Sequence, residues 1–357
     1  MQTLNEKEWK EVNLEDEFGF ERGKEKNMAE LSSGDIPLIS ARKVNNGLKD
    51  FVKNPAKIIT GNHVISLNND GDGGAGLAYF QSIDFALDTH VTALHPKKVV
   101  PKMALLFLST AISKQHAVFG HGRSISLSRA KRLKAMLPVT GSGEPDYDYM
   151  AQYVVEHQTM MLQRYRHYVA ELVSQLEYQT IPALQEKTWQ NFFFKDIFSS
   201  IQRGKRLIKE HQISGKKPYI SSTALNNGVD NFIDNNEGIR IFDYCLTIAN
   251  SGSVGASFFH PYAFVASDHV THLKNEQFNE YIYLFIASVS RRLSEKYNFN
   301  REINEQRIAK EQIMLPVTSS GKPDYDYMEQ YAKNIMRRKY AQYLAFIEAK
   351  QSFATHL

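Results

Sequence analysis

The sequence predicts an α+β protein made of two tandem domains, each with a twisted β-sheet and each followed by a long helix. Residues 137–150 read LPVTGSGEPDYDYM and residues 315–328 read LPVTSSGKPDYDYM, with twelve identities in fourteen positions. Matched residues precede this anchor in both copies, and apolar residues recur at helical spacing after it. The predicted organisation is a first domain (1–145), a first helix with its linker (146–188), a second domain (189–323) and a second helix (324–357).

Composition agrees with two globular domains and adds a charge pattern. The chain has 357 residues, of which 42% are hydrophobic and 23% charged, enough for two cores of ordinary size. It contains no apolar run of about eighteen residues and its N-terminus is charged, so a cytoplasmic protein without a membrane segment is expected. Residues 1–145 hold 19 Lys and Arg against 16 Asp and Glu, and residues 189–323 hold 16 against 13, so the positive excess lies in the domains. A solvated surface of mixed sign is the alternative explanation.

The elements of the two copies follow in the same order. Each copy begins with an aromatic and acidic segment and then has a basic turn around Gly23 or Gly204. Short apolar segments predict strands at 36–40, 63–67 and 91–94, and at 217–221, 245–249 and 270–273. Asn-Asn-Gly predicts a hairpin in each copy, at 45–47 and 226–228, because these residues supply the positive φ of a tight turn. Helices are expected at 103–115 and 280–296.

The end of each copy predicts a long amphipathic helix. Apolar and tyrosine side chains recur with a period near 3.6 residues, which puts them on one helical face. They are Met150, Tyr153, Val154, Met161, Tyr165, Tyr168, Leu172 and Leu176, and then Met328, Tyr331, Ile335, Tyr340, Tyr343 and Ile347. Pro145 and Pro323 are expected in the first helical turn, and the helices should span about 35 and about 27 residues, roughly 50 and 40 Å. Such a stripe needs a partner, and the other helix is the nearest candidate.

No motif for catalysis or metal binding emerges from the sequence. It holds no Asn-Pro-Pro-aromatic loop, no GxxxxGK[ST] loop and no Cys/His cluster. Gly71, Gly73 and Gly76 spell GxGxxG, but a strand is predicted after them, which favours a turn over dinucleotide binding. Two further interpretations favour structure over chemistry: His90 and His269 as locally bonded histidines rather than metal ligands, and Cys245 as a buried inert thiol.

Taken together, these residues resemble the DNA-specificity (S) subunits of type I and type IIB restriction-modification systems. The resemblance covers both halves and rests on Trp9 and Trp189 with the basic turns Arg22-Gly23-Lys24 and Arg203-Gly204-Lys205. It continues through the Gly-rich turns GGAGLAYF and GSVGASFF, the Arg-containing stretches that run into Leu-Pro, and the long helices. The PDYDYM segment and the short chain favour the type IIB side of the family.

The resemblance implies a non-catalytic role and a set of partners. Each domain would be a target-recognition domain that reads one half of a split, asymmetric DNA target, and the helices would lie antiparallel as a coiled-coil spacer. Methyltransferase subunits or fused nuclease-methyltransferase subunits, expected in two copies, would dock on the helices and bind S-adenosylmethionine and Mg²⁺, with ATP in a type I system. This chain itself would bind no cofactor and no metal. Partner binding is assigned to Met150, Tyr153, Tyr165, Tyr168, Leu172, Met328, Tyr331, Ile335 and Tyr343.

Double-stranded DNA is the second predicted partner. Phosphates attract Lys and Arg whatever the sequence, so basic positions matched between the copies suit backbone contacts: Arg22, Lys24, Arg123, Arg203, Lys205 and Arg301. The same basic regions also contain Arg129, Arg132, Arg206, Arg307 and Lys310. Positions that differ suit base readout, for which the candidates are Arg42, Lys43, His121, Asn298 and Asn300, with Asn226 and Asn227 answering Arg42 and Lys43. A non-catalytic protein-interaction scaffold is the main alternative function, and an enzyme of unrecognised type is a third.

Overall fold

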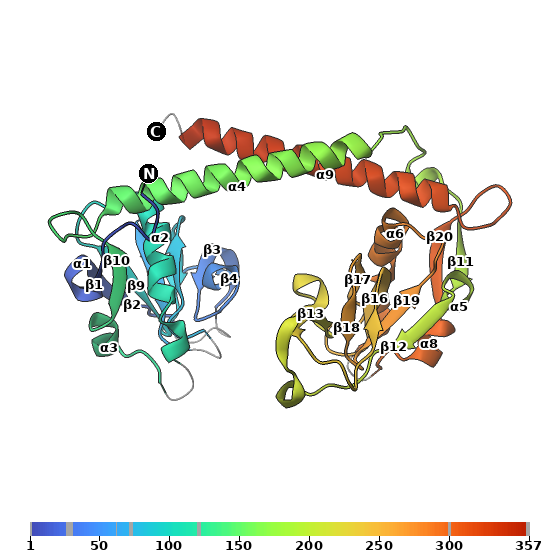
Figure 1. Ribbon diagram of the computed structural model, residues 1–357, viewed down its shortest axis with the longest axis horizontal. Coiled ribbons are helices and arrows are strands. Elements are labelled where there is room, and N and C mark those ends of the chain that lie inside the picture. The colour runs from blue at the N-terminus through green and yellow to red at the C-terminus, as the bar shows by residue number, and fades with distance from the viewer. Residues whose placement is uncertain are drawn as a thin grey trace. The chain divides into compact units, whose positions relative to one another are not determined.

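The structure is a computed structural model that describes residues 2–25, 31–61, 63–70, 74–119, 123–298 and 301–354 (Figure 1). The chain divides into two compact units, unit 1 (Met1–Tyr165) and unit 2 (Arg166–Leu357). The division falls inside the first long helix, so each unit contains one sheet-containing domain and part of the helical region. In the described part of the chain, no helix combines the length and the apolar character needed to cross a membrane.

Unit 1 contains ten strands and four helices among its described residues. The strands are β1 (Trp9–Asn13), β2 (Phe18–Arg22), β3 (Ser33–Ile39), β4 (Leu48–Val52), β5 (Ile58–Ile59), β6 (Val64–Asn68), β7 (Ala78–Gln81), β8 (Phe85–Leu87), β9 (Val91–Pro96) and β10 (Lys134–Pro138). The helices are α1 (Leu14–Glu17), α2 (Lys102–Ser113), α3 (Leu127–Lys131) and α4 (Tyr147–Gln175), the last of which continues into unit 2.

Unit 2 repeats this order of elements. Its strands are β11 (Trp189–Phe193), β12 (Ser200–Arg203), β13 (Ser214–Ile220), β14 (Val229–Ile233), β15 (Ile241–Phe242), β16 (Cys245–Ala249), β17 (Ser257–His260), β18 (Phe264–Ala266), β19 (Val270–Lys274) and β20 (Gln312–Pro316). Its helices are α5 (Phe194–Ile197), α6 (Glu280–Ser290), α7 (Leu293–Lys296), α8 (Glu305–Ala309) and α9 (Tyr325–Ala354).

The sheet topology is the same in both units. Unit 1 has sheets of order β2-β9-β6-β7, β4-β3-β8-β5 and β1-β10, and unit 2 has β12-β19-β16-β17, β14-β13-β18-β15 and β11-β20. In each unit one pair is parallel, β3 with β8 and β13 with β18, while the other pairs are antiparallel. The duplication seen in the sequence is therefore a duplication of the fold.

The predicted hairpins are confirmed, and their turns show why the Asn-Asn-Gly sequence recurs. Residues 45–47 have φ of 54°, 52° and 78°, and residues 226–228 have φ of 49°, 53° and 80°. Asn and Gly are the residues that adopt this left-handed conformation at least cost. The turn lets β4 pair with β3 and β14 pair with β13.

One helix covers the main sheet of each unit and forms its core. In unit 1, Leu105, Leu108 and Ile112 of α2 are fully buried against the apolar face of β6 and β9. In unit 2, Ile282, Phe285 and Ile286 of α6 take the same place over β16 and β19. Burial of these side chains stabilises each fold because it removes apolar area from water.

Cys245 also lies in the interior of unit 2, as predicted. The residue is fully buried, and burial raises the pKa of its thiol to about 12. A thiol with that pKa is almost entirely protonated near neutral pH, and a thiolate is the reactive form. The interpretation of Cys245 as a buried thiol is confirmed.

Strand pairing closes each domain in a way that the sequence analysis missed. β1 pairs with β10 in the register Trp9 with Pro138, and β11 pairs with β20 in the register Trp189 with Pro316. The first strand of each copy therefore joins the last, directly before the long helix. Pairing over such a sequence distance leaves no local pattern from which it could be predicted.

The long helices differ in detail from the prediction. The structure gives α4 29 residues rather than about 35 and α9 30 residues rather than about 27. Pro145 and Pro323 lie before the first turn, bridged to Val139 and Val317. The following aspartates are the caps, because Asp146 accepts from the N–H of Tyr149 at 3.0 Å. The helix predicted at 280–296 is also divided, with α6 ending at Ser290 before α7 begins.

Within unit 2, the end of α4 runs antiparallel to α9. Arg166 approaches Glu348 at 3.5 Å, and the guanidinium of Arg337 donates to the carbonyl of Leu176 at 3.0 Å. Val169 and Leu176 of α4 are buried in this region. Side chains of α9 thus hold the last ten residues of α4 and the segment that follows them.

Candidate nucleic-acid interface

Several loops of each unit meet around one buried asparagine. In unit 1 the main chain of Asn69 accepts from the N–H of Ile125 at 2.6 Å and donates to the carbonyl of His90 at 2.8 Å. Its side-chain oxygen accepts from the hydroxyl of Thr92 at 2.9 Å. Asn69 therefore connects the turn after β6, the turn before β9 and the segment before α3. We call the surface formed by these loops the loop end of unit 1.

Asn250 has the same contacts in unit 2. It accepts from the N–H of Ile303 at 3.0 Å, donates to the carbonyl of His269 at 2.8 Å and accepts from the hydroxyl of Thr271 at 2.8 Å. Both asparagines are almost completely buried. The sequence analysis missed them, although an asparagine followed by a matched threonine, 23 residues later in unit 1 and 21 residues later in unit 2, was the available signal.

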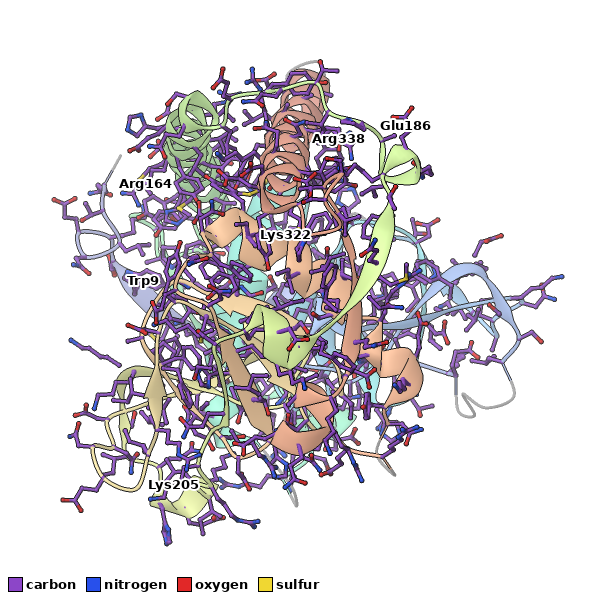
Figure 2. All side chains as sticks on the ribbon, turned by 90° about the vertical axis from the view of Figure 1, so that its right-hand side faces the viewer. Trp9, Arg164, Glu186, Lys205, Lys322 and Arg338 are labelled. Carbon is purple, nitrogen blue, oxygen red and sulfur yellow. The ribbon has the colours of Figure 1, made fainter. Side chains whose placement is uncertain are left out.

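The loop end and the long helix lie at opposite ends of each unit. Figure 1 shows α3 far from α4 within unit 1, and α8 far from the N-terminal part of α9 within unit 2. In Figure 2, Lys205 lies at the end of unit 2 remote from Arg338 on α9. This separation leaves one end of each unit for a ligand and the other for the helical region.

Basic residues predicted to bind DNA occupy the loop end of unit 1. Arg22 ends β2 and Lys24 follows it, Arg42 and Lys43 follow β3, and Arg123 precedes α3; all are exposed. Arg129 and Arg132 are exposed as well, and they donate to the carbonyls of Ser124 at 2.9 Å and Ser128 at 3.2 Å.

Unit 2 presents an equivalent set. Lys205 and Arg206 are exposed after β12, and Lys310 is exposed after α8. Arg307 donates to the carbonyl of Glu302 at 2.6 Å, which reproduces the contact of Arg129. Arg301 is exposed, with its guanidinium 5.3 Å from the centre of the Tyr297 ring.

The turns at Arg22-Gly23-Lys24 and Arg203-Gly204-Lys205 recur for a structural reason in addition to their charge. The Nε–H of Arg22 donates to the carbonyl of Thr89 at 2.8 Å, and that of Arg203 donates to Asp268 at 2.8 Å. A Cβ on Gly23 would overlap the carbonyl of Asp88, and one on Gly204 would overlap that of Ala266. Glycine is required because two main-chain segments approach too closely for a side chain.

The predicted match between the two Asn-Asn-Gly turns is confirmed, so Asn226 and Asn227 do not occupy the positions of Arg42 and Lys43. The N–H of Ser40 donates to Gly47 at 2.9 Å and that of Ser221 to Gly228 at 2.9 Å, so the turns align residue by residue. Arg42 and Lys43 therefore correspond to Thr223 and Ala224. Asn226 and Asn227 correspond instead to Asn45 and Asn46, and their left-handed backbone explains the asparagines in both copies.

Three other candidates have different outcomes. His121 and Asn300 lie outside the described residues, as do Gly71 and Gly73 of the GxGxxG sequence. Asn298 is exposed and lines a cavity of about 540 Å³ at the loop end of unit 2.

The two matched histidines each have a local partner, as interpreted. Nδ1 of His90 lies 2.9 Å from Oδ2 of Asp70, and Nδ1 of His269 lies 2.7 Å from Oγ of Ser251. Among the described residues, no group of three or more His, Cys, Asp and Glu side chains could hold a metal ion. The geometry supports structural roles for both histidines.

At the other end of each unit, aromatic residues join the domain to its long helix. In unit 1 the ring of Trp9 stacks on Phe107 at 6.1 Å, and Phe107 meets the edge of Tyr153 at 5.8 Å. Lys7 pairs with Asp146 at 2.6 Å and lies over the ring of Tyr149. We call this group of residues the helix junction of unit 1.

Unit 2 has a helix junction with the same contacts. Trp189 stacks on Phe285 at 6.3 Å, and Phe285 meets the edge of Tyr331 at 5.6 Å. Lys187 pairs with Asp324 at 2.7 Å. Each domain is thus fixed to the start of its helix in the same manner, and the PDYDYM segment supplies the helical half of the junction.

The predicted partner-binding residues divide between the interior and the surface. Met150 and Met328 are fully buried in the cores of their own units, so they are removed from the partner surface: their side chains point into the domains. Tyr168 and Tyr343 are about half exposed, at 53% and 50%. The remaining five are partly buried: Tyr153, Tyr165, Leu172, Tyr331 and Ile335.

Comparison with known proteins agrees with this duplicated architecture. The family model of the type I restriction modification DNA specificity domain matches residues 6–160 and again residues 186–343. The type II restriction enzyme specificity subunit S.BcgI of Heyndrickxia coagulans is 31% identical over 310 residues, which cover 85% of this chain and 87% of that protein.

Two solved structures are similar at low sequence identity. The type I restriction-modification S subunit from M. genitalium has 14% identity and a TM-score of 0.48, with 99% of this chain and 96% of that chain covered. The HsdS subunit from Thermoanaerobacter tengcongensis has 11% identity and a TM-score of 0.33, with 96% and 91% covered. Because the family model matches most of the chain in two successive copies, the chain belongs to the type I restriction-modification DNA specificity family.

Proposed function

We propose that this chain is the DNA-recognition subunit of a restriction-modification complex and reads a bipartite, asymmetric target with one unit per half-site. The observation that carries the proposal is the contrast between the two ends of each unit. The helix junctions have the same contacts in both copies, whereas the loop ends differ in their side chains. Two junctions with the same contacts can bind two copies of one partner. Two loop ends with different side chains can bind two different DNA sequences.

The loop ends have the charge and exposure that DNA binding requires. Arg123 and Arg301 are exposed and occupy matched positions before α3 and α8. Matched cations suit phosphate contacts, because the backbone is the same at both half-sites. Arg42 and Lys43, which correspond to Thr223 and Ala224, are better suited to reading bases in one half-site only.

The helix junctions offer a matched apolar surface to a protein partner. Met136 on β10 is 53% exposed and Met314 on β20 is 47% exposed. Each lies in the wall of a groove beside a junction tryptophan, Trp9 in unit 1 and Trp189 in unit 2, with volumes of about 930 and 360 Å³. Exposed apolar residues of this kind mark protein interfaces. We assign the parts of these two grooves around Met136 and Met314 to two copies of a methyltransferase or a fused nuclease-methyltransferase subunit.

A type IIB-like complex is the favoured form of the partner. The curated relative belongs to a type II restriction enzyme and aligns over most of both chains. S-adenosylmethionine and Mg²⁺ would then bind to the partner subunits, and ATP would be needed only if the complex were of type I. The long helices would act as an antiparallel coiled-coil spacer that sets the distance between half-sites.

The proposal is tested by expressing the chain with its methyltransferase partner in a host that lacks other DNA methylation. Sequencing of methylated positions should give one split target with two different halves. In binding measurements across a salt series, Arg123→Ala and Arg301→Ala should each weaken binding to all sequences and flatten the salt dependence, since each removes about one phosphate contact.

Lys322→Ala is the matched control, because Lys322 is exposed at the helix end of unit 2 and copy one has Glu144 at that position. It should leave the salt dependence unchanged. A palindromic target, or unchanged binding in both arginine variants, would contradict the proposal. A complex with the partner that shows no selectivity for any DNA would favour the scaffold alternative.

A further inference from the structure

The cavity at the loop end of unit 2 contains one predicted site residue, Asn298, and several residues that the sequence analysis did not select. It has a volume of about 540 Å³, in the range of small-molecule sites. Its walls come from the turn between β16 and β17, from the end of α6 and from α7, with Ala224 contributed by the turn after β13. None of the residues described around it is acidic.

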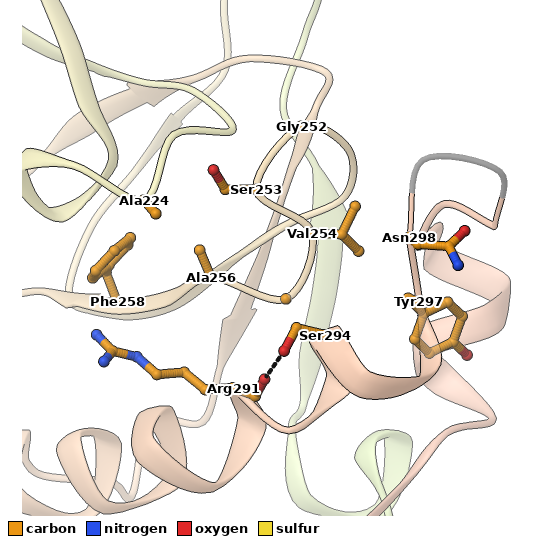
Figure 3. Close-up of a pocket in the computed structure, with 11 residues that line it drawn as sticks. Ala224, Gly252, Ser253, Val254, Ala256, Phe258, Arg291, Ser294, Tyr297 and Asn298 are labelled. Atoms are coloured by element: carbon orange, nitrogen blue, oxygen red, sulfur yellow. Dashed lines mark hydrogen bonds between the residues drawn. The ribbon is translucent and has the colours of Figure 1, made fainter. Parts of the chain in front are cut away.

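Arg291 is the cation of this cavity. It follows α6 directly, and its guanidinium lies 5.6 Å from the centre of the Phe258 ring. Figure 3 shows the side chain extended below Phe258, with Tyr297 and Asn298 on the other side of the cavity. In the described part of the chain, the ring of Phe258 is the only contact recorded for this guanidinium.

An arginine that lies over an aromatic ring keeps its N–H donors available for a ligand. The attraction between the cation and the face of the ring holds the side chain in place, and it uses none of the guanidinium N–H groups as hydrogen-bond donors. Two such N–H groups match the O6 and N7 acceptors of guanine in the major groove, the commonest specific contact between an arginine and a base.

The corresponding residues of unit 1 show that this cation is specific to one copy. Phe107 and Phe285 are matched residues, because each stacks on the junction tryptophan of its unit. Ser113 follows Phe107 at the same distance in sequence as Arg291 follows Phe285, so Ser113 is the counterpart of Arg291. The hydroxyl of Ser113 is used inside the domain, with Oγ 2.8 Å from the N–H of Ala78.

At the positions that face Arg291 in the cavity, unit 1 has the cation and unit 2 has none. Ala224 lies where unit 1 has Lys43, and Phe258 lies where unit 1 has Tyr79. In unit 1, Lys43, Tyr79 and Ser113 belong to the groove that also contains Trp9 and Met136, whereas in unit 2 Ala224, Phe258 and Arg291 line a cavity that shares no residue with the groove of Trp189 and Met314. The positive charge is therefore on Lys43, after β3, in unit 1 and on Arg291, after α6, in unit 2. A common phosphate contact would not require this exchange, but two different bases would.

We infer that Arg291 is a specificity-determining residue that contacts a guanine in the half-site read by unit 2. The inference rests on the proposed function, because it requires unit 2 to bind DNA. It was absent from the sequence-based candidates, since Arg291 belongs to a predicted helix and has no basic counterpart in the first copy.

The test uses the complete complex with its methyltransferase subunits. In the Arg291→Ala variant, sequencing of methylated DNA should show one guanine of one half-site relaxed to other bases, while the other half-site stays unchanged. In competition between duplexes that differ only at this base pair, the preference for guanine should fall on the order of 10- to 100-fold.

Lys322→Ala is again the control, since Lys322 is exposed and lines neither this cavity nor the groove beside Met314. It should keep the target of the unaltered complex. The unchanged second half-site in Arg291→Ala reports that the chain remains folded. If methylation is lost everywhere, the duplex competition still measures the preference at each base pair.

Two results would overturn the inference while leaving the proposed function intact. One is a split target that Arg291→Ala does not change at any position. The other is a uniform loss of affinity for all duplexes with a flatter salt dependence, which would make Arg291 a phosphate contact. Failure of the unaltered complex to select any split target would instead contradict the proposed function itself.

Discussion

Single residues explain why parts of the two copies could not diverge. Gly23 and Gly204 sit where main-chain carbonyls approach too closely for a Cβ, and both are preceded by arginines that bind the neighbouring turn. Gly141 is different, because a Cβ there would meet nothing within 4 Å, and the second copy has Ser319 at the same position. The structure thus separates glycines that the fold requires from one that it tolerates.

Alanine substitution should separate these two kinds of glycine. We expect Gly23→Ala and Gly204→Ala each to lower the free energy of unfolding of their unit by about 1–3 kcal/mol, since the added methyl forces the main chain apart. Gly141→Ala should be neutral or slightly stabilising. Denaturant unfolding of the whole chain, followed by circular dichroism, provides the measurement. Equal stability in all three variants would show that the close approach is not restrictive.

At the scale of elements, the helix junction determines where each long helix begins. Asp146 caps α4 through the N–H of Tyr149 and pairs with Lys7, whose side chain is only 13% exposed. Burial by itself would raise the pKa of this carboxyl, but the bonds from Lys7 and from the Tyr149 N–H outweigh it, and the pKa lies below the ordinary value. The charged form of Asp146 is therefore favoured by folding.

Substitution of Asp146 should weaken the junction in a pH-dependent way. Asp146→Ala should lower the free energy of unfolding by about 1–2 kcal/mol through loss of the cap, with Asp148→Ala as the control. Asp148 lies in the same first turn and is exposed. Because the folded-state pKa is depressed, the difference between the unaltered chain and Asp146→Asn should be complete above about pH 4.

That difference should then shrink as the pH falls through the lower folded-state pKa, where the carboxyl takes up a proton in the folded chain as well. Urea unfolding at a series of pH values from 7 to 2 measures it. A difference that grows on acidification would show that Asp146 is not held in its charged form.

At the scale of the whole molecule, the chain is a non-catalytic member of the specificity family with its domain present twice. Under the proposed function, two equal junctions on one chain provide two equal docking sites, and this would account for junctions that are more alike between the copies than the loop ends. The sites carry Met136 and Met314, one in each unit.

Glutamate at these methionines should remove partner subunits one at a time. Met136→Glu or Met314→Glu should each reduce the complex from two partner copies to one, and the double variant should bind none, because a charge is buried at the interface. Light scattering of the purified complex gives the number of copies. Ile213→Glu is the control, since Ile213 is 61% exposed and lines neither groove. Two bound copies in the double variant would place docking elsewhere.

The proposed spacer role of the helices predicts a change in target spacing. Insertion of seven residues after Glu171 in α4 and seven after Tyr343 in α9 should lengthen both helices by about 10 Å, or roughly three base pairs. Both insertions fall between the Arg166–Glu348 and Leu176–Arg337 contacts. Methylated targets should keep both half-sites and gain spacing, whereas a target with unchanged spacing would rule out a helical ruler.

The sequence alone determined the duplication, the hairpins, the main strands and helices, and the family, because each depends on residues close together in the chain or on their repetition. Only the tertiary structure paired β1 with β10, placed Asn69 and Asn250 under the loop ends, and moved Met150 and Met328 from the partner surface into the cores. It also brought Arg291 onto Phe258 beside Ala224. These relations join segments that are remote in the chain, and local preferences carry no information about which remote segments pack together.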